Sequence, residues 1–248
     1  MPISAVLITK NAARQLADCL ASVAFCDEII VVDSGSDDGT VEIAGQHGAK
    51  VIQSEWRGFG PQKQFAVEQA DHDWVLCIDA DERVSEDLRE NILAVSPAPT
   101  VSAYRFARCN RFMGRYLRHG EGYPDWSLRL FDRRHARWSD DPVHEKVITT
   151  GVIGTLQGDL LHESAESLEV YLAKQNRYST LAAQEALASG KRATVMHLLF
   201  SPALRFIKFY FLRLGLLDGL PGLVHILIGC GASFGKYAKM LAFQRSGK

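Results

Sequence analysis

Short apolar runs alternate with helical patterns over the first hundred residues. The runs consist of consecutive apolar side chains ending near turn residues, which is typical of buried strands; they are residues 4–9, 28–33, 49–52 and 74–79. The segments between them carry apolar residues at helical spacing; they are residues 13–23, 40–48 and 61–70. Strand and helix in this order predict an α/β fold, a parallel sheet with helices on both faces.

The last third of the chain has a different pattern. A long amphipathic helix is predicted from Ser167 to about Gly190. Beyond it, residues 195–217 and 222–243 are apolar but interrupted by charged residues and prolines. No uninterrupted apolar stretch approaches the roughly 20 residues that a membrane span requires. We therefore expect a first domain over residues 1–165 and amphipathic helices over 166–248.

The charge is unevenly distributed along the chain. The formal net charge is −1, which argues against a general nucleic-acid-binding protein. From Lys191 onward nine basic residues face one acid, Asp218, so this segment carries +8 and the rest −9. Basic amphipathic helices are typical of proteins that lie on an anionic membrane surface. Alternatively, these helices pack on the first domain or on a second copy in a homo-oligomer.

The cysteines and the N-terminus indicate a cytoplasmic protein. The five cysteines form no CxxC pair, so neither a zinc site nor a disulfide framework is indicated. The N-terminal sequence MPISAVLITKN has no basic segment followed by an apolar core and a cleavage site, so it predicts a first strand rather than a signal peptide.

Acidic residues gather where two of the predicted strands end. Asp33 closes the second strand, and Asp79 with Asp81 closes the fourth. In parallel sheets ligands bind at the carboxyl ends of the strands, so a binding site is expected there. The turn that follows Asp33, SGSDDGT, also has the composition of a helix-capping turn. Because GxGxxG and GxxxxGK are both absent, a dinucleotide fold and a P-loop are not indicated.

The Asp79-x-Asp81 pair is the sharper signal. Two carboxylates beside one turn can approach a single hard cation, Mg²⁺ or Mn²⁺, with diphosphate oxygens completing its shell. They have no nearby cationic partner in the sequence except Arg83. One alternative is a solvated turn, including Glu82, that leads into a helix capped by Ser85. Another is an aspartyl phosphatase with Asp79 as nucleophile, although that motif does not usually continue with Glu and Arg.

Taken together, these motifs resemble a known family. ITKN, IIVVDSGSDDGT, the Lys of GFGPQKQFA and DWVLCIDADE, in this order over residues 3–95, resemble the nucleotide-sugar half of inverting glycosyltransferases of family 2, which have the GT-A fold. WSLRLFDRR, DPVHEKV, GDLLHES and GLLDGLPGLVH extend the resemblance to the subgroup similar to bacterial lipopolysaccharide-core β-1,4-glucosyltransferases. Ala12 departs from the pattern, because many relatives carry Glu there and use it as a nucleotide contact.

The resemblance implies roles for the residues of the first half. Thr9 and Asp33 would hold the uracil and ribose of a UDP-sugar, with Lys63 nearby, and Asp79 would lie near the ribose or the metal. Asp81 would bind the cation that bridges the phosphates. The resemblance also divides the first domain into a nucleotide-sugar half, residues 1–105, and an acceptor half, residues 106–165.

Other charged residues are candidates for the chemistry. Arg129 would be a basic partner for the leaving UDP, and His162 would complete the metal shell or contact a phosphate, unless it is structural. Inversion is a single displacement, so a carboxylate must take the proton of the acceptor hydroxyl. The candidates are Asp125, Asp140, Asp141 and Glu145. The resemblance favours Glu145, oriented by His144, and Asp140 and Asp141 suit a turn before Pro142.

The acceptor is expected to be a lipid-anchored saccharide. Residues 109–145 interleave arginines with tyrosines and tryptophans, which suits a phosphate-bearing sugar, although single arginines can simply pair with surplus acids. The resemblance implies transfer of glucose from UDP-glucose to an inner-core heptose of lipopolysaccharide, at the cytoplasmic face of the inner membrane. The alternatives are a polyprenyl-phosphate glycosyltransferase and a non-catalytic module on a membrane surface.

Overall fold

The computed structural model describes the chain except residues 97–99, 142–144, 165–166 and 247–248. His144, which the sequence analysis named as a partner of Glu145, lies outside the described residues. The chain forms two compact units. Unit 1 comprises Met1–Cys109 and Asp125–Glu163, and unit 2 comprises Asn110–Pro124 and Ser164–Lys248. Residues 110–124, expected in the acceptor half of the first domain, therefore group with the C-terminal helices.

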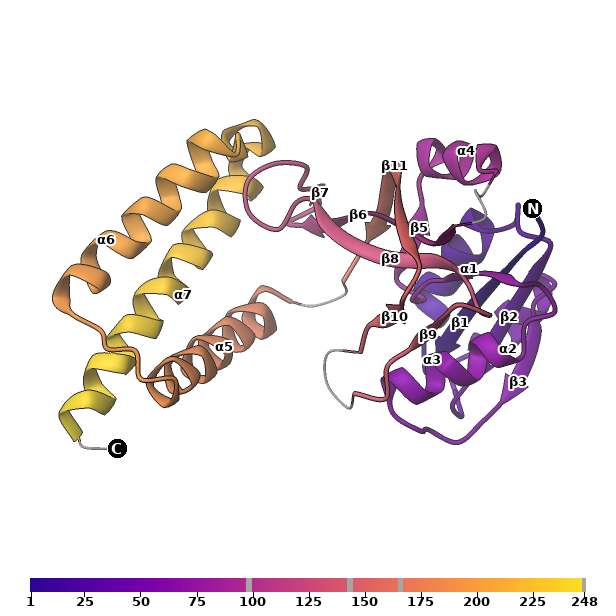
Figure 1. Ribbon diagram of the computed structural model, residues 1–248, viewed down its shortest axis with the longest axis horizontal. Helices are drawn as coiled ribbons and strands as arrows, with labels where there is room; N and C mark the ends of the chain where they lie inside the picture. The colour runs from indigo at the N-terminus through magenta and orange to yellow at the C-terminus, as the bar shows by residue number, and fades with distance from the viewer. Residues whose placement is uncertain (97–99, 142–144, 165–166, 247–248) are drawn as a thin grey trace. The chain divides into compact units, whose positions relative to one another are not determined.

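A mixed sheet forms the centre of unit 1 (Figure 1). Its strand order is β3-β2-β1-β4-β8-β6-β11-β5. The strands are β1 (Ile3–Thr9), β2 (Glu28–Asp33), β3 (Lys50–Gln53), β4 (Trp74–Cys77), β5 (Glu82–Val84), β6 (Val101–Phe112), β8 (Asp125–Asp132) and β11 (Val152–His162). The first four are parallel, as the alternating pattern predicts, and β8 then pairs antiparallel with β4 and with β6. A separate hairpin joins β9 (Ala136–Trp138) to β10 (Val147–Thr149).

Helices cover both faces of this sheet. They are α1 (Ala13–Ser22), α2 (Thr40–Gln46), α3 (Phe59–Glu68) and α4 (Glu86–Ala94). Alternate residues of β1 point to opposite faces. Leu7 lies in the core shared with α1 and α4, whereas Val6 lies in the core shared with α3. The expected α/β fold with two covered faces is confirmed.

Two local signals in the sequence correspond to helix ends. Ser85 caps α4, because its hydroxyl accepts a hydrogen bond from the backbone N–H of Leu88 at 3.3 Å. Gly48 follows α2 with a φ of +73°, a left-handed conformation that ends a helix without strain in glycine.

Unit 2 is a bundle of helices with a short hairpin strand, β7 (Arg115–Tyr116), that pairs with the end of β6. The helices are α5 (Leu168–Ala188), α6 (Val195–Phe206), the π-helix η1 (Ile207–Leu212), the 3₁₀ helix η2 (Gly215–Asp218) and α7 (Gly219–Ser246). Ser167 caps α5 through a hydrogen bond from Val170 N–H, as the sequence predicts. Asp218 is buried and accepts two hydrogen bonds from His119, from its backbone N–H at 2.8 Å and its ring at 3.0 Å.

Two segments of unit 2 are apolar over a greater length than the sequence analysis expected. By length and composition alone, Val195–Leu212 and Gly215–Ser246 could cross a membrane. Core helices of soluble proteins satisfy the same criteria, but none of the first segment is buried in the structure and only about a third of the second is.

Candidate active site

The carboxyl ends of β1 and β2 meet, and Asp33 lies between them. Thr9 pairs in register with Asp33, and its hydroxyl donates a 2.9 Å hydrogen bond to the Asp33 carboxylate. Backbone N–H groups of Gly35 and Ser36 donate to the same carboxylate at 3.0 and 2.9 Å. Burial alone raises the pKa of Asp33, but the hydrogen bonds from Ser36, Thr9 and Gly35 outweigh it and lower that pKa.

The turn after Asp33 also has the capping role that its composition allows. Asp38 accepts a hydrogen bond from the backbone N–H of Ala13, at the start of α1. It also accepts one from the N–H of Thr40, the first residue of α2. The hydrogen bonds of Asp33 and Asp38 thus fix the turn that follows β2. Of Thr9, Asp33 and Asp38, Thr9 is the residue that lines a cavity.

A cavity of about 720 Å³ opens at this edge of the sheet. Its described lining includes Thr9 but not Asp33, which is fully buried. The remaining described lining residues are Ile8, Lys10, Asn11, Ala12, Gln15, Trp56, Phe59, Lys63, Asp79, Ala80, Asp81, Glu145 and His162. We call it the donor cavity, after the UDP-sugar donor that the resemblance in the sequence leads us to expect at this edge of the sheet. Four sequence-predicted polar residues from distant parts of unit 1 therefore meet here with Thr9 and Lys63.

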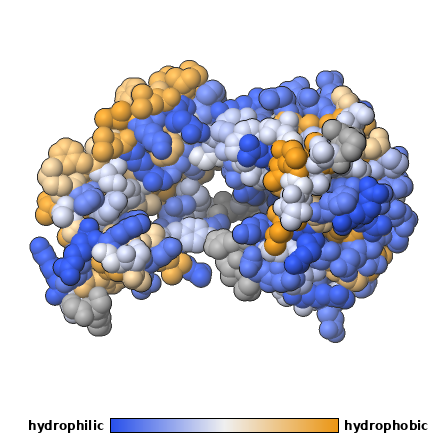
Figure 2. Space-filling model, viewed as in Figure 1, coloured by the Kyte–Doolittle hydropathy of each residue, from blue (hydrophilic) through white to orange (hydrophobic). Residues whose placement is uncertain are grey.

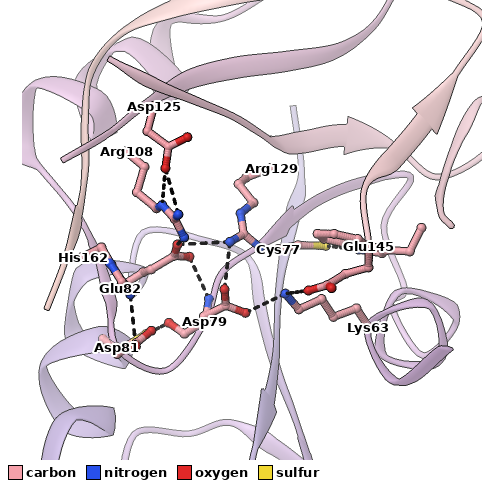
Figure 3. A network of polar contacts seen from close by, with 12 residues as sticks. Lys63, Cys77, Asp79, Asp81, Glu82, Arg108, Asp125, Arg129, Glu145 and His162 are labelled. Carbon is pink, nitrogen blue, oxygen red and sulfur yellow. Dashed lines mark hydrogen bonds and ion pairs between the residues drawn. The ribbon is translucent and has the colours of Figure 1, made fainter. Parts of the chain in front are cut away.

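Asp79 is the centre of a polar network (Figure 3). Lys63 from α3 lies 3.0 Å from one of its carboxylate oxygens, and Arg129 from β8 lies 2.8 Å from the other. Burial raises the pKa of Asp79, but Arg129 and Lys63 outweigh it and hold that pKa well below its usual range. The expectation that Asp79 has no cationic partner but Arg83 is wrong, because Arg83 pairs with Asp18 and Glu163 instead.

Glu82 was missed as a site residue. The sequence placed it in a solvated turn, whereas it is fully buried behind Asp79. Its carboxylate accepts hydrogen bonds from the Asp79 backbone N–H at 2.9 Å and from Arg129 at 3.1 Å. Burial raises the pKa of Glu82 against the opposing effect of Arg129. The sequence carries no signal for this position, because its partner Arg129 lies 47 residues away.

Arg108 extends the network to Asp125. The guanidinium of Arg108 lies 2.8 Å from the Asp125 carboxylate and 3.6 Å from Glu82. Figure 3 shows this ion pair on the side of Arg129 away from Lys63. Asp125 is thus held by a cation. It is not among the described lining residues of the donor cavity, nor of the neighbouring cavity described below.

Asp81 and His162 form a separate pair on the donor cavity. The His162 ring nitrogen lies 3.2 Å from the Asp81 carboxylate. Among the residues that the structure describes, no group of three or more His, Cys, Asp or Glu side chains is placed to hold a metal ion. A carboxylate and an imidazole still fit a divalent cation that takes its other ligands from substrate phosphates and water. Asp79 contributes less to such a site, because its oxygens face Lys63 and Arg129.

Glu145 faces the same lysine as Asp79. Its carboxylate lies 3.2 Å from Lys63, and about 20 % of its side chain is exposed. A glycine in α3 allows this approach: a Cβ on Gly60 would lie 2.2 Å from the Ser139 carbonyl oxygen and 3.4 Å from the Glu145 Cβ. Asp140, by contrast, is exposed and pairs with Arg137 at 3.4 Å.

A second cavity of about 460 Å³ lies beside the first. We call it the acceptor cavity, after the acceptor sugar that the sequence leads us to expect in this half of the domain. Its described lining is Lys63, Asp79, Arg108, Trp126, Ser127, Leu128, Arg129, Trp138, Glu145, Lys146 and Val147. Three residues line both cavities: Lys63, Asp79 and Glu145. Two molecules bound in the two cavities would therefore come closest to each other at these shared residues.

The arginines of residues 109–145 do not form one cluster. Arg111 and Arg115 belong to unit 2, where Arg115 donates to the Leu217 carbonyl at 3.0 Å. In unit 1, Arg134 pairs with Asp132 and Asp73. The simpler interpretation, that single arginines pair with acids, therefore holds for Arg134, and for Arg137 with Asp140.

Comparison with known proteins identifies the family of this chain. Residues 4–153 match the family described as Glycosyl transferase family 2. The chain is 35 % identical to the lipopolysaccharide core biosynthesis glycosyltransferase LpsC of Rhizobium meliloti (strain 1021), over 97 % of this chain and 92 % of the relative. It is 33 % identical to the uncharacterized glycosyltransferase RT0209 of Rickettsia typhi, over 96 % of this chain and 86 % of the relative.

Solved structures share the fold. The mannosyltransferase PcManGT from Pyrobaculum calidifontis, in complex with GDP-Man and Mn²⁺, covers 99 % of this chain and 76 % of its own, with a TM-score of 0.52 and 17 % identity. Residues 1–349 of S. aureus TarS in complex with UDP cover 100 % of this chain and 92 % of that one, with a TM-score of 0.51 and 15 % identity. The aspartyl phosphatase and the non-catalytic module are thereby set aside. The chain belongs to glycosyltransferase family 2, has a GT-A-like fold and is a glycosyltransferase.

Proposed function

We propose that this enzyme transfers glucose from UDP-glucose, with inversion and with a divalent cation, to a heptose of the lipopolysaccharide inner core. The observation that carries the proposal is the boundary between the two cavities. Lys63, Asp79 and Glu145 line both, so a donor in one and an acceptor in the other would meet at charged side chains. The lipopolysaccharide core in the name of the relative LpsC supports the class of acceptor.

The donor is proposed to bind at the ends of β1 and β4. Thr9 lines the donor cavity, and its hydroxyl donates a hydrogen bond to the buried Asp33. Lys63 supplies positive charge at the wall of the donor cavity, and Arg129, which lines the neighbouring cavity, adds charge from the other side of Asp79. Burial lowers the pKa of Arg129, but Asp79 and Glu82 outweigh it and raise that pKa, so its guanidinium stays charged as UDP leaves.

Asp81 and His162 are the residues that we propose for the cation. Their 3.2 Å separation brings an oxygen and a nitrogen donor to the same wall of the donor cavity. A bound Mg²⁺ or Mn²⁺ would neutralise the charge that develops on the leaving diphosphate. The role of this chain is to hold the two side chains together and to leave the other positions open to the substrate.

Glu145 is the proposed base. Glu145 lines both cavities and its carboxylate lies 3.2 Å from Lys63, which suits a group that takes a proton from an acceptor hydroxyl next to the donor. Asp125 is the other candidate, but it is not among the described lining residues of either cavity, and Arg108 binds its carboxylate at 2.8 Å. Trp126, about 45 % exposed, offers an aromatic face in the acceptor cavity for a sugar ring.

The acceptor is proposed to be anchored in lipid. That implies an enzyme held peripherally at the cytoplasmic face of the inner membrane, for which the exposed apolar helices of unit 2 are the supporting observation. A polyprenyl phosphate is the alternative acceptor. Its phosphate oxygen needs no proton removed, so a Glu145→Gln enzyme with unchanged activity would favour it.

Calorimetric titration tests the donor half of the proposal. UDP-glucose, UDP-galactose and GDP-mannose are each titrated into the protein with Mn²⁺ and with a chelator. We expect UDP-glucose to bind best and only with the metal, and Asp81→Ala to lose this metal dependence. Absence of binding by any of the three nucleotides would overturn the assignment of Thr9, Asp79 and Asp81.

A further inference from the structure

An exposed apolar row runs along α6 and η1. Its members recur at intervals of three or four residues, so they share one side of the helix. We call them the α6 stripe: Met196, Leu199, Phe200, Leu204, Ile207 and Phe211. Each is 48–63 % exposed, and neither α6 nor η1 contains a buried residue. Hydrophobic side chains accordingly gather over α6 in Figure 2.

Helix α7 packs beside α6 and carries a second exposed row. Ser201 and Ser233 are hydrogen-bonded across the two helices at 2.9 Å. On α7, Leu220, Leu227 and Phe234 recur every seventh residue and are 66, 51 and 49 % exposed. Two exposed apolar rows on adjacent helices are rare on a protein that meets only water, so a partner is expected to cover them.

The hairpin of α6 and α7 is not free to cross a bilayer without α5. Tyr171 near the start of α5 lies 3.0 Å from His225 near the start of α7, so these helices begin at the same end of the bundle. At the other end only residues 189–194 join α5 to α6. If α6 and α7 crossed the membrane, α5 would cross with them.

Helix α5 is unsuited to hydrocarbon. It carries two acids and two bases within 21 residues: Glu169, Lys174, Arg177 and Glu185. Each charge at the centre of a bilayer costs about 2.5–3.5 kcal/mol even on the lower scale. α5 is also bound to α7 by polar contacts, since Lys239 donates to Asn176 and Ser179 at 2.7 Å each. A spanning bundle is therefore disfavoured.

The turn between α6 and α7 is tied to the segment that enters unit 2 from the sheet. Gly120 N–H donates to the Arg213 carbonyl at 2.8 Å, and Asp218 accepts from His119. This segment, residues 110–124, continues directly from β6 and into β8. The turn therefore stays beside residues 110–124 and cannot move alone to the far side of a membrane.

The net charge of unit 2 indicates which kind of partner covers the exposed apolar residues. It contains 14 Lys and Arg against 5 Asp and Glu, a formal net charge of +9 within a chain of net charge −1. A second copy of the chain would bring an equally charged unit against it. An anionic lipid surface offers opposite charge together with an apolar interior.

We propose that the α6 stripe lies in the boundary between headgroups and acyl chains of one anionic leaflet, with α6 parallel to the membrane plane. The proposal deepens the membrane location given under the proposed function, and it does not depend on the reaction that the enzyme catalyses. Met196 and Phe211, at opposite ends of the stripe, then lie at the same depth.

Spin labels at Leu199 and Phe211, toward the two ends of the stripe, test the orientation. Cysteines are introduced by Leu199→Cys or Phe211→Cys in a Cys26→Ser chain, labelled with a nitroxide, and measured on vesicles of about 30 % phosphatidylglycerol. The labels are 12 residues apart, about 18 Å along a helix. Equal accessibility to oxygen and to an aqueous relaxant is expected. A difference in depth approaching that length would mean that α6 crosses the bilayer and would overturn the proposal.

A triple glutamine variant tests the partner. Leu199→Gln, Phe200→Gln and Leu204→Gln together are expected to lower the vesicle-bound fraction at least tenfold in flotation. The matched control changes three apolar residues of unit 1 with similar exposure: Leu93→Gln, Val152→Gln and Ile153→Gln. Equal binding by both variants contradicts the proposal, as does a wild type that ignores vesicles and dimerises through the stripe. UDP-glucose binding is measured on every sample, so a vesicle-bound protein that fails to bind it counts against the reaction alone.

Discussion

At the scale of single residues, one substitution at Glu145 tests its proposed role as the base directly. Its carboxylate is 3.2 Å from Lys63, which also holds Asp79 at 3.0 Å. Replacing the carboxylate by an amide removes the proton acceptor but keeps a similar shape. We expect Glu145→Gln to bind UDP-glucose as the wild type does and to lose about 10²–10⁴-fold in the rate of transfer. Initial rates and calorimetry on the same preparation check this.

Asp140→Asn is the matched control for that experiment. Asp140 lies in the same loop, is exposed and pairs with Arg137. It should retain both binding and rate. If the two variants lost donor binding equally, Glu145 would belong to the donor site rather than to the proton transfer, and Asp125 would become the candidate base.

Asp33 links the turn after β2 to stability. The lowered pKa of Asp33 means that the folded state favours its charged form. The contribution of Asp33 to the free energy of unfolding is therefore fully present above the pKa of the unfolded chain, and it is lost as the pH falls through the pKa of the folded chain. Asp33→Asn should therefore lower the free energy of unfolding by about 1.5–3 kcal/mol near neutral pH. The difference from wild type should shrink below about pH 4.

Urea unfolding at several pH values measures this difference. Asp37→Asn, an exposed position in the same turn, is the control and should leave the unfolding midpoint in place. If the free energy of unfolding of the Asp33→Asn chain stayed below that of the wild type by a constant amount down to about pH 3, the loss would come from altered packing and hydrogen-bond geometry rather than from the missing charge.

At the scale of elements, the approach of α3 to the loop after β9 determines where Glu145 lies. Gly60 has an ordinary helical backbone, so Ala there introduces no φ strain, but its Cβ would come 2.2 Å from the Ser139 carbonyl oxygen. The loop must move, and Glu145 moves with it. We expect Gly60→Ala to reduce the rate of transfer at least tenfold while thermal unfolding still shows a folded protein.

The matched change for that prediction is Gly45→Ala in α2. A Cβ there meets nothing within 4 Å, and Ala favours the helix by about 1 kcal/mol relative to Gly. The Gly45→Ala enzyme should retain its rate. If Gly60→Ala were equally active, the contact between α3 and the loop would not position the base.

The sequence predicted the elements of the sheet better than the contacts of the site. The parallel strands and both capping serines follow from local patterns, because apolar alternation and side-chain caps involve residues within one turn or strand. The partners of Asp79 do not, since Lys63 and Arg129 come from α3 and β8 and meet it only after the sheet forms. For the same reason no local pattern indicated that Glu82 is buried, and residues 110–124 group with unit 2 through contacts with distant residues such as Asp218 and Arg213.

At the scale of the whole molecule, the two units carry opposite charge. Unit 2 has a formal net charge of +9, which leaves −10 for unit 1. An anionic leaflet thus attracts the helical unit and repels the one with the active site. Attraction between separated charges is screened by salt, with a Debye length of about 10 Å at 0.1 M and about 3 Å at 1 M. Apolar insertion of the α6 stripe is not weakened in this way.

Salt should therefore separate the two contributions to membrane binding. Raising NaCl from about 0.05 to about 0.5 M is expected to slow the recruitment of the wild type to phosphatidylglycerol vesicles yet leave most of the bound protein in place. The triple glutamine variant of the α6 stripe keeps the charge of unit 2 but not its apolar row, so the same salt should release nearly all of it. Flotation at both salt concentrations measures the bound fractions. If the wild type were released as completely as the variant, charge alone would hold the enzyme on the membrane and the exposed row would need another partner.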